Sequence, residues 1–304
     1  MHREPFFTYL QIERNYSVHT LRAYETDLRD LAAWLTAHFA CDLWETEGAA
    51  CVTHRHLRSW MAQLMEQGCT ARTVARKLSS ARSYFRYLRR AHLLPANPAA
   101  RLRLPRFEQK LPVFLQESET EELLRLDVFG DTFEEQRDRC MLELLYGCGL
   151  RRSELIGLRL ADVNRYARTL RVRGKGNKER ILPYGRHAAD AIDTYLEAAR
   201  RDNIALDAAF FVRPNAQPLY PKLVYETVGR HLARVSTRSR RSPHVLRHTF
   251  ATHMLDRGAD LDAIKELLGH SSLAATQVYT HNTISKLKAV HDQAHPRAGT
   301  YKDQ

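Results

Sequence analysis

The first 93 residues show the hydrophobic spacing of amphipathic helices. Apolar side chains recur every three or four positions in stretches that begin after Ser17, Thr53 and Thr70, each of which is a typical N-cap. Gly68 supplies a stop signal for the second stretch. The positions expected to face inward are Leu21, Tyr24, Leu28, Leu31 and Leu35, then Leu57, Trp60, Leu64 and Met65, then Val74, Leu78, Ala81, Phe85 and Leu88. The pattern predicts a helical domain over 1–93.

The helical period stops at residues 94–112 and returns beyond them. This stretch reads LPANPAARLRLPRFEQKLP and contains four prolines, each of which disfavours helix at the residue before it. Such composition is typical of an extended linker. We therefore predict a second domain over 113–298, followed by a tail at 299–304.

Most of the second domain has helical spacing, but one stretch has a different period. At 169–183, Leu170 and Val172 alternate with arginines, and a period of two predicts a strand. The Gly-Lys-Gly-Asn sequence at 174–177 is typical of a hairpin turn, so Ile181 should lie in the return strand. The predicted fold class is mainly α with a small β-hairpin, in two domains.

The expected helices of the second domain differ in character. A capping box at Ser118–Glu121 opens the first helix. The next, at about Asp138–Tyr146, is apolar on most sides and should be buried. Two more are expected at Ala188–Arg200 and Lys222–Val235. The last, at 284–290, is about two turns long with one apolar side, so it needs a groove on its own chain or on a neighbour's.

Composition narrows the class of protein. The 304 residues include 47 Lys+Arg against 35 Asp+Glu, and a net charge of +12 indicates a polyanionic partner. Five cysteines without C-x-x-C spacing indicate reduced thiols and no cysteine metal site. No apolar run is long enough for a signal peptide or a membrane span. We therefore expect a cytoplasmic protein that does not contact membranes.

The positive charge is concentrated at the end of the first domain. Residues 67–107 contain no acid and ten basic residues, whereas a merely solvated helix face usually carries mixed signs. We therefore predict nucleic-acid contact here, with a salt-dependent affinity from released counterions. The arginines of the linker would lie along the same DNA. The candidate DNA-binding residues are Arg72, Arg76, Lys77, Arg82 and Arg86.

Candidate chemistry gathers between Ser242 and Thr280. Ser-Pro starts a helix on which His244 and Arg247 share a face, because residues three apart are neighbours. A helix N-terminus with a histidine and an arginine suits a phosphate. His270 follows Gly269, and Tyr279 comes nine residues later. Taken singly, His270 could be a core histidine and Tyr279 a packed ring.

Two further candidates lie upstream. Arg151 begins a helix, and Glu154 three residues on can orient it from the same face, although an exposed Arg–Glu pair would contribute little. Lys175 is at the tip of the predicted hairpin, where a lysine is usually solvated. The density of basic residues around it argues instead for contact with a nucleic-acid backbone.

Five stretches taken in order resemble the tyrosine site-specific recombinases, and most closely those of the Xer type. They read RNYSVHTLRAYETDL, GLRRSELIGL, RGKGNKERILP, SPHVLRHTFATHML and LLGHSSLAATQVYTH, and they extend over both domains. The resemblance implies a helical, SAM-like core-binding domain and a catalytic domain that together form a C-shaped DNA clamp. It implies six catalytic residues, with Tyr279 as the nucleophile: Arg151, Lys175, His244, Arg247, His270 and Tyr279.

The chemistry of phosphodiester cleavage explains why these residue types are needed. A tyrosine with its ordinary pKa near 10 resists ionisation at pH 7 by about 4 kcal/mol, so a phenolate nucleophile needs a base or cations nearby. Arg151 and Arg247 can hold the phosphate oxygens and take the place of a metal ion. Lys175 is the candidate general acid, while the roles of His244 and His270 stay open. We expect no metal and no cofactor.

Three readings of function remain open. The first is a Xer-type recombinase that resolves chromosome dimers through a 3′-phosphotyrosyl intermediate. The second is the integrase of a phage or mobile element; such enzymes often carry an extra N-terminal domain, whereas the core-binding pattern here starts almost at Met1. The third is a DNA-binding regulator without catalysis, which the six intact candidates argue against. A topoisomerase shares the chemistry but lacks such an N-terminal domain.

The resemblance also implies the partners. These are a double-stranded recombination site and a homo- or hetero-tetramer, the latter with a second Xer-type recombinase. The C-terminal segment of each subunit would dock on a neighbour. A septal DNA translocase is a further expected partner.

Overall fold

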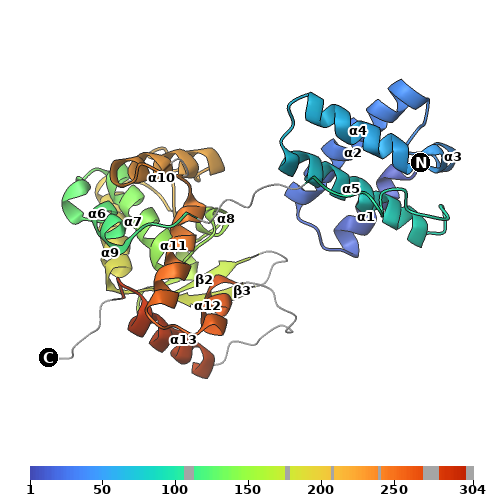
Figure 1. Cartoon of the computed structure of the whole chain (residues 1–304). Helices are drawn as coiled ribbons and strands as arrows, with labels where there is room; N and C mark the ends of the chain where they lie inside the picture. The colour runs from blue at the N-terminus through green and yellow to red at the C-terminus, as the bar shows by residue number, and fades with distance from the viewer. Residues whose placement is uncertain (106–112, 175–178, 207–208, 239–240, 270–280, 299–304) are drawn as a thin grey trace. The chain divides into compact units, whose positions relative to one another are not determined.

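The computed structural model describes residues 1–105, 113–174, 179–206, 209–238, 241–269 and 281–298, the first three residues of the last range by their backbone only. The chain divides into two units, Met1–Lys110 and Leu111–Gln304 (Figure 1). The predicted fold class is confirmed: the described residues are mainly helical, with one small antiparallel sheet. None of the described helices is both long and apolar enough to cross a bilayer.

The first unit is a helical bundle. Its helices are α1 (Arg3–Ile12), α2 (Val18–Phe39), α3 (Thr46–Cys51), α4 (His54–Glu66) and α5 (Ala71–Arg90). The three predicted caps are confirmed, because the hydroxyls of Ser17, Thr53 and Thr70 each accept a backbone N–H three residues on. The hydrophobic spacing of the sequence predicts neither α1 nor α3. Phe6 and Leu10 of α1 are nevertheless part of the core.

The beginning of the predicted linker packs on this bundle. Leu94, Ala99 and Leu102 are buried in the core of the first unit. Arg82 of α5 donates from Nε to the carbonyl oxygen of Ala99 at 3.1 Å and from Nη2 to that of Leu102 at 2.7 Å. The segment up to Leu102 is therefore attached to α5.

The second unit surrounds a buried helix. Its elements, in order, are α6 (Glu117–Leu123), η1 (Leu126–Val128), α7 (Phe133–Gly147), α8 (Arg152–Ile156), η2 (Leu160–Asp162), β1 (Val163–Asn164), β2 (Thr169–Arg173), β3 (Glu179–Pro183), α9 (Arg186–Arg201), α10 (Pro221–Val235), α11 (Pro243–Asp256), α12 (Leu261–Leu268) and α13 (His281–Ala294). Every residue of α7 from Gln136 to Gly147 is buried. Helices α9 and α11 pack against α7.

The predicted hairpin is confirmed within an antiparallel sheet of order β1-β2-β3. Leu170 pairs with Leu182 and Arg173 with Glu179. The apolar positions of β2 are buried and its arginines are exposed, as the period of two requires. The two-residue strand β1 was missed because it is too short to show a period.

Two helix boundaries and one cap contact differ from the prediction. The first helix is capped by Gln116, whose N–H donates to Glu119 at 2.7 Å, because the chain enters the helix two residues before Ser118. Helix α7 starts five residues earlier than expected, behind the Thr132 cap. Ser242 precedes α11 with Pro243 as its first residue, but the Ser242 hydroxyl makes no cap hydrogen bond.

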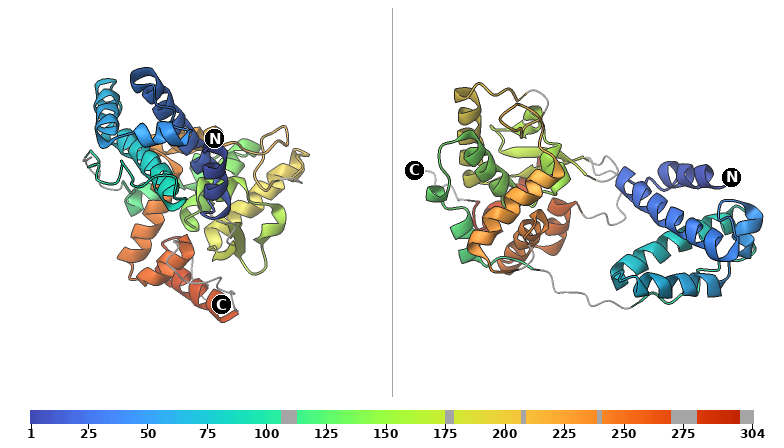
Figure 2. Two further views of the ribbon diagram at one scale, coloured as in Figure 1. Left: turned by 90° about the vertical axis from the view of Figure 1, so that its right-hand side faces the viewer. Right: turned by 90° about the horizontal axis from the view of Figure 1, so that it is seen from above.

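Helix α13 is also longer than the two turns expected. It packs on α11, α12 and β3 of its own unit, and the three helices form the orange-to-red region of Figure 2. Leu287 is buried, and the His291 ring lies 2.8 Å from the carbonyl oxygen of Gly147. The hydrophobic pattern missed the last turns because buried histidines, not apolar residues, make part of their contact.

Candidate active site

Arg151 stands at the start of α8, where Glu154 orients it. Its backbone N–H donates to Glu154 Oε2 and its Nη1 to Glu154 Oε1, both at 2.8 Å. The carboxylate is buried, whereas the Arg151 side chain is 29% exposed. The predicted pairing is therefore present, and it is not the weak surface pair that spacing alone allowed. The Arg151 guanidinium can therefore contact a ligand, while the Glu154 carboxylate is shielded from solvent.

Glu154 has a second partner that the sequence did not suggest. Arg180 of β3 donates from Nη1 and Nη2 to the two Glu154 oxygens at 2.8 and 2.9 Å. Burial alone would raise the pKa of Glu154, but the hydrogen bonds and charge of Arg180, together with Arg151, hold that pKa below its ordinary value. The carboxylate therefore stays ionised near neutral pH.

Three arginines meet at the C-terminal end of α12. Arg180 Nε donates to the carbonyl oxygen of Leu267 at 2.9 Å, and Arg151 Nη2 to that of Gly269 at 3.1 Å. Arg247 of α11 donates to the carbonyl between them, that of Leu268. The last carbonyls of a helix lack partners within the helix and carry partial negative charge, so guanidinium groups suit them. The arginines fix the chain at the residue before His270.

Arg247 is buried, and its environment disfavours its positive charge. Its Nη1 donates to the carbonyl oxygen of Gly149 at 2.6 Å. Burial, followed by repulsion from Arg151, lowers the pKa of the Arg247 guanidinium to about 10. The group is still a cation at neutral pH. Three guanidinium groups (Arg151, Arg180 and Arg247) face one carboxylate, so the site has an excess of positive charge that an anion such as a phosphodiester would balance.

His244 lies one turn before Arg247 on α11 and is exposed. Residues three apart on a helix share a face, so the histidine and the arginine are presented together as predicted. Two of the six catalytic candidates, Arg151 and Arg247, are thus joined through the end of α12, with His244 beside the second.

The other three candidates, Lys175, His270 and Tyr279, lie outside the described residues. Residues next to them in the chain are described. Arg173 pairs with Glu179 across the hairpin, with Nε and Oε1 2.7 Å apart, immediately before and after the tip. Gly269 directly precedes His270, and α13 begins two residues after Tyr279.

The candidate DNA-binding residues of α5 have different environments. Lys77 is buried, and its ammonium bonds Asp30 and lies 3.6 Å from Asp27. Arg76 also pairs with Asp27, and Arg82 holds the 94–102 segment as described above. These pairs join α5 to α2, so the acid-free window is partly neutralised by another helix. Their contact with DNA stays a prediction, and the geometry favours a structural role for Lys77. Arg72 and Arg86 are exposed.

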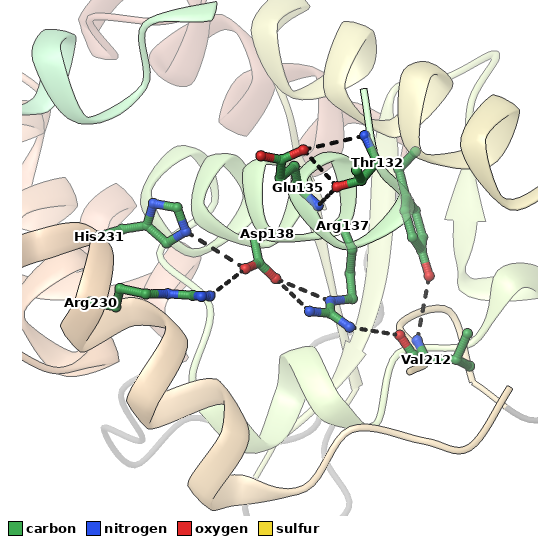
Figure 3. Close-up of polar contacts among 8 residues, drawn as sticks. Thr132, Glu135, Arg137, Asp138, Val212, Arg230 and His231 are labelled. Atoms are coloured by element: carbon green, nitrogen blue, oxygen red, sulfur yellow. Dashed lines mark hydrogen bonds and ion pairs between the residues drawn. The ribbon is translucent and has the colours of Figure 1, made fainter. Parts of the chain in front are cut away.

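A second buried carboxylate lies elsewhere in the same unit. Asp138 of α7 accepts from Arg137 Nε and Nη2 at 3.1 and 2.8 Å and from Arg230 Nη2 at 2.9 Å (Figure 3). The His231 ring nitrogen Nε2 is 3.6 Å from the same carboxylate, and Arg137 Nη1 reaches the Val212 carbonyl at 3.5 Å. These contacts join α10 and the Val212 region to α7, and none of the three described catalytic candidates takes part in them.

Arg180 is the member of this arginine cluster that sequence reasoning missed. The available signal was its position in β3, where it shares a sheet face with Leu182, a buried residue two positions on. A charged side chain on the buried face of a strand needs a partner, because an unpaired charge there would be very costly.

Comparison with known proteins agrees with this geometry. The phage integrase family matches residues 114–286, and the N-terminal SAM-like domain of phage integrases matches residues 4–92. The tyrosine recombinase XerC of Chlorobaculum parvum is 40% identical over 97% of this chain and 94% of its own length. XerC of Pelobacter propionicus is 42% identical over 97% and 95%. The chain therefore belongs to the phage integrase family and is a tyrosine recombinase, an enzyme that breaks and rejoins DNA.

Solved structures share the fold. The XerH site-specific recombinase bound to a palindromic difH substrate superposes with a TM-score of 0.68 at 20% identity, covering 92% of this chain and 81% of that one. The Tn1549 transposon integrase in complex with a circular intermediate DNA gives 0.69 at 19% identity, covering 93% and 97%. At these identities the likeness establishes the architecture alone.

Proposed function

We propose that this enzyme recombines a specific chromosomal DNA site and so converts chromosome dimers to monomers, with Tyr279 as its nucleophile. The single observation that carries the catalytic assignment is that Arg151 and Arg247 bond neighbouring carbonyls at the end of α12. The two cations that we take to bind the phosphate would then lie directly before the sequence segment that contains His270 and Tyr279. The full-length similarity to XerC proteins supports the chromosomal role over that of a mobile element.

The proposed reaction is a transesterification. The Tyr279 phenol oxygen forms a bond to phosphorus while the bond from phosphorus to the 5′ oxygen breaks. One histidine, His244 or His270, takes the phenol proton, and Lys175 gives a proton to the departing 5′ oxygen. Arg151 and Arg247 stabilise the charge that gathers on the non-bridging oxygens. The 3′-phosphotyrosyl link keeps the phosphoester energy, so attack by a 5′ hydroxyl of the partner duplex rejoins DNA without ATP.

DNA binding and assembly complete the proposal. The basic helix α5 of the first unit would contact the duplex, with Arg72, Arg76 and Arg86 as its exposed candidates. The segment at 94–112 would join this core-binding domain to the catalytic domain at 113–298. As the family resemblance implies, four subunits would act on two sites in the cytoplasm, with a second Xer-type recombinase and a septal DNA translocase as the expected partners.

A nicked suicide substrate tests the nucleophile, because cleavage beside the nick releases the 5′ strand and traps the covalent adduct. We expect Tyr279→Phe to bind a duplex carrying the recombination site of the replication terminus as wild type does, and to form no adduct. Tyr225→Phe is the matched control, since Tyr225 is an exposed tyrosine of α10 and should retain trapping. Trapping by Tyr279→Phe at the wild-type level would overturn the assignment.

A further inference from the structure

We propose that Arg180 is a positioning residue of the recombination reaction, which aligns Arg151 through Glu154 and fixes the end of α12 ahead of His270. This inference rests on the proposed function, because it takes Arg151 to be a phosphate ligand. It concerns a residue that reaches no substrate itself.

The contacts of Arg180 leave it no direct role. It is 5% exposed, and each of its three guanidinium nitrogens donates to a protein oxygen. Two of these bonds form a fork on Glu154, a geometry that fixes the plane of the carboxylate. The same carboxylate binds Arg151 through its backbone N–H and its Nη1. The orientation of the Arg151 guanidinium is therefore set from β3 through one shared group.

The third bond of Arg180 connects the Glu154–Arg151 pair to the end of α12. Its Nε holds the Leu267 carbonyl, next to the carbonyls taken by Arg247 and Arg151. Arg180 also packs so closely under Gly269 that a Cβ there would lie 3.1 Å from Nη1. A shift of Arg180 would move the helix end and both phosphate ligands together.

Arg180 also belongs to the hairpin that carries Lys175. It lies in β3 opposite Val172 of β2, next to the Arg173–Glu179 pair that flanks the hairpin tip. Three parts of the proposed site therefore meet at this side chain: the hairpin, the start of α8 and the end of α12. Alignment of separate groups within an ångström is worth orders of magnitude in rate, so its loss should affect the chemical step.

The test compares Arg180→Met with Arg137→Met. Arg137 is a matched control because it is equally buried in the same unit, bonds a buried carboxylate twice and donates to a backbone carbonyl. We measure single-turnover cleavage of the nicked substrate, the Kd for DNA and its salt dependence, and the Tm of each variant. We expect Arg180→Met to slow cleavage about 100-fold with Kd and salt slope near wild type. Arg137→Met should lower the Tm and leave the rate within about threefold.

A double variant separates positioning from stability. Removing both charges in Arg180→Met/Glu154→Gln should recover part of the Tm lost by the single variant, because an unpaired buried charge is no longer left behind. The cleavage rate should stay low, because neither the Arg180 fork nor the Glu154 carboxylate is left to align Arg151. Arg180→Lys keeps the charge without the fork and should cleave at an intermediate rate.

Each outcome supports or overturns the inference. Recovery of the rate together with the Tm in the double variant would show that Arg180 serves stability alone. A wild-type rate in a folded Arg180→Met, or a rate loss explained by weaker DNA binding, would also overturn it. Failure of the proposed function is recognised separately, by adduct formation in Tyr279→Phe.

Discussion

Two of the buried carboxylates in the second unit, Glu154 and Asp138, have nearly the same immediate surroundings. Each accepts two hydrogen bonds from an arginine that is 5% exposed, and that arginine also reaches a backbone carbonyl. They differ in their next partner. Asp138 binds Arg230 on α10, whereas Glu154 binds Arg151 at the start of α8. A buried arginine–carboxylate pair therefore says little about function by itself. The contacts of the more exposed arginine that binds the same carboxylate are more informative.

The further contacts of these more exposed arginines, Arg151 and Arg230, distinguish the two clusters. Arg151 donates to the Gly269 carbonyl at the end of α12, where Arg247 and Arg180 donate to the adjacent carbonyls. Arg230 is 66% exposed and joins α10 to α7. One cluster thus brings cations to a single point in the chain, and the other connects two helices. The first two predictions below test this difference, and the third, with the smallest effect, extends the comparison of exposed and paired cations to α5.

The largest effect should come from the more exposed arginines. Arg151→Ala removes a donor to the transition-state oxygens, and such a loss slows reaction by about 10²–10³-fold. Arg230→Ala removes the corresponding partner of Asp138 and should cleave at close to the wild-type rate. Single-turnover cleavage at saturating DNA measures both. Equal losses in the two variants would contradict the functional distinction between the clusters.

A smaller effect should follow from alanine at two glycines. Gly269 and Gly258 both have left-handed backbone, with φ of 63° and 83°, so Ala at either should reduce the free energy of unfolding by about 1 kcal/mol. An added Cβ meets Arg180 at Gly269 but has nothing within 4 Å at Gly258. We expect only Gly269→Ala to slow cleavage, by several-fold. Denaturant unfolding and cleavage assays on both variants check this, and a similar rate loss in Gly258→Ala would argue that backbone strain is the cause.

The smallest effect concerns basic residues of α5. Arg86 is exposed, so Arg86→Gln should weaken DNA binding a few-fold and lower the slope of log K against log salt by about 1. Lys77 bonds Asp30 and lies near Asp27, so Lys77→Met should lower stability and leave the slope unchanged. Titrations at several salt concentrations distinguish the two. A reduced salt slope in Lys77→Met would show instead that Lys77 contacts the DNA backbone.

The extent to which sequence predicted this structure follows from the range of each interaction. Local contacts were readable: the caps at Ser17, Thr53 and Thr70, and the Arg151–Glu154 pair, join residues three apart. Arg180 was not, because its partners are 26 and 87 residues away in the chain. Such a pairing depends on how β3, α8 and α12 come together, which no local period encodes.

Polar groups in the core were the other source of error. The acid-free window of α5 suggested an uninterrupted basic face, yet Asp27 of α2 neutralises part of it. The end of α13 was missed because His291 packs where a hydrophobic pattern expects an apolar residue. In both cases the partner that makes a polar group compatible with burial comes from a distant part of the chain.

The bonds from Arg82 to the Ala99 and Leu102 carbonyls limit how far the two units can separate. With 94–102 attached to α5, the connection between the two units has at most residues 103–112 in place of 94–112. At about 3.5 Å per residue, its greatest length falls from roughly 65 Å to roughly 35 Å. Once the first unit is on DNA, the second explores a volume about sixfold smaller, so its effective concentration at nearby phosphates rises accordingly.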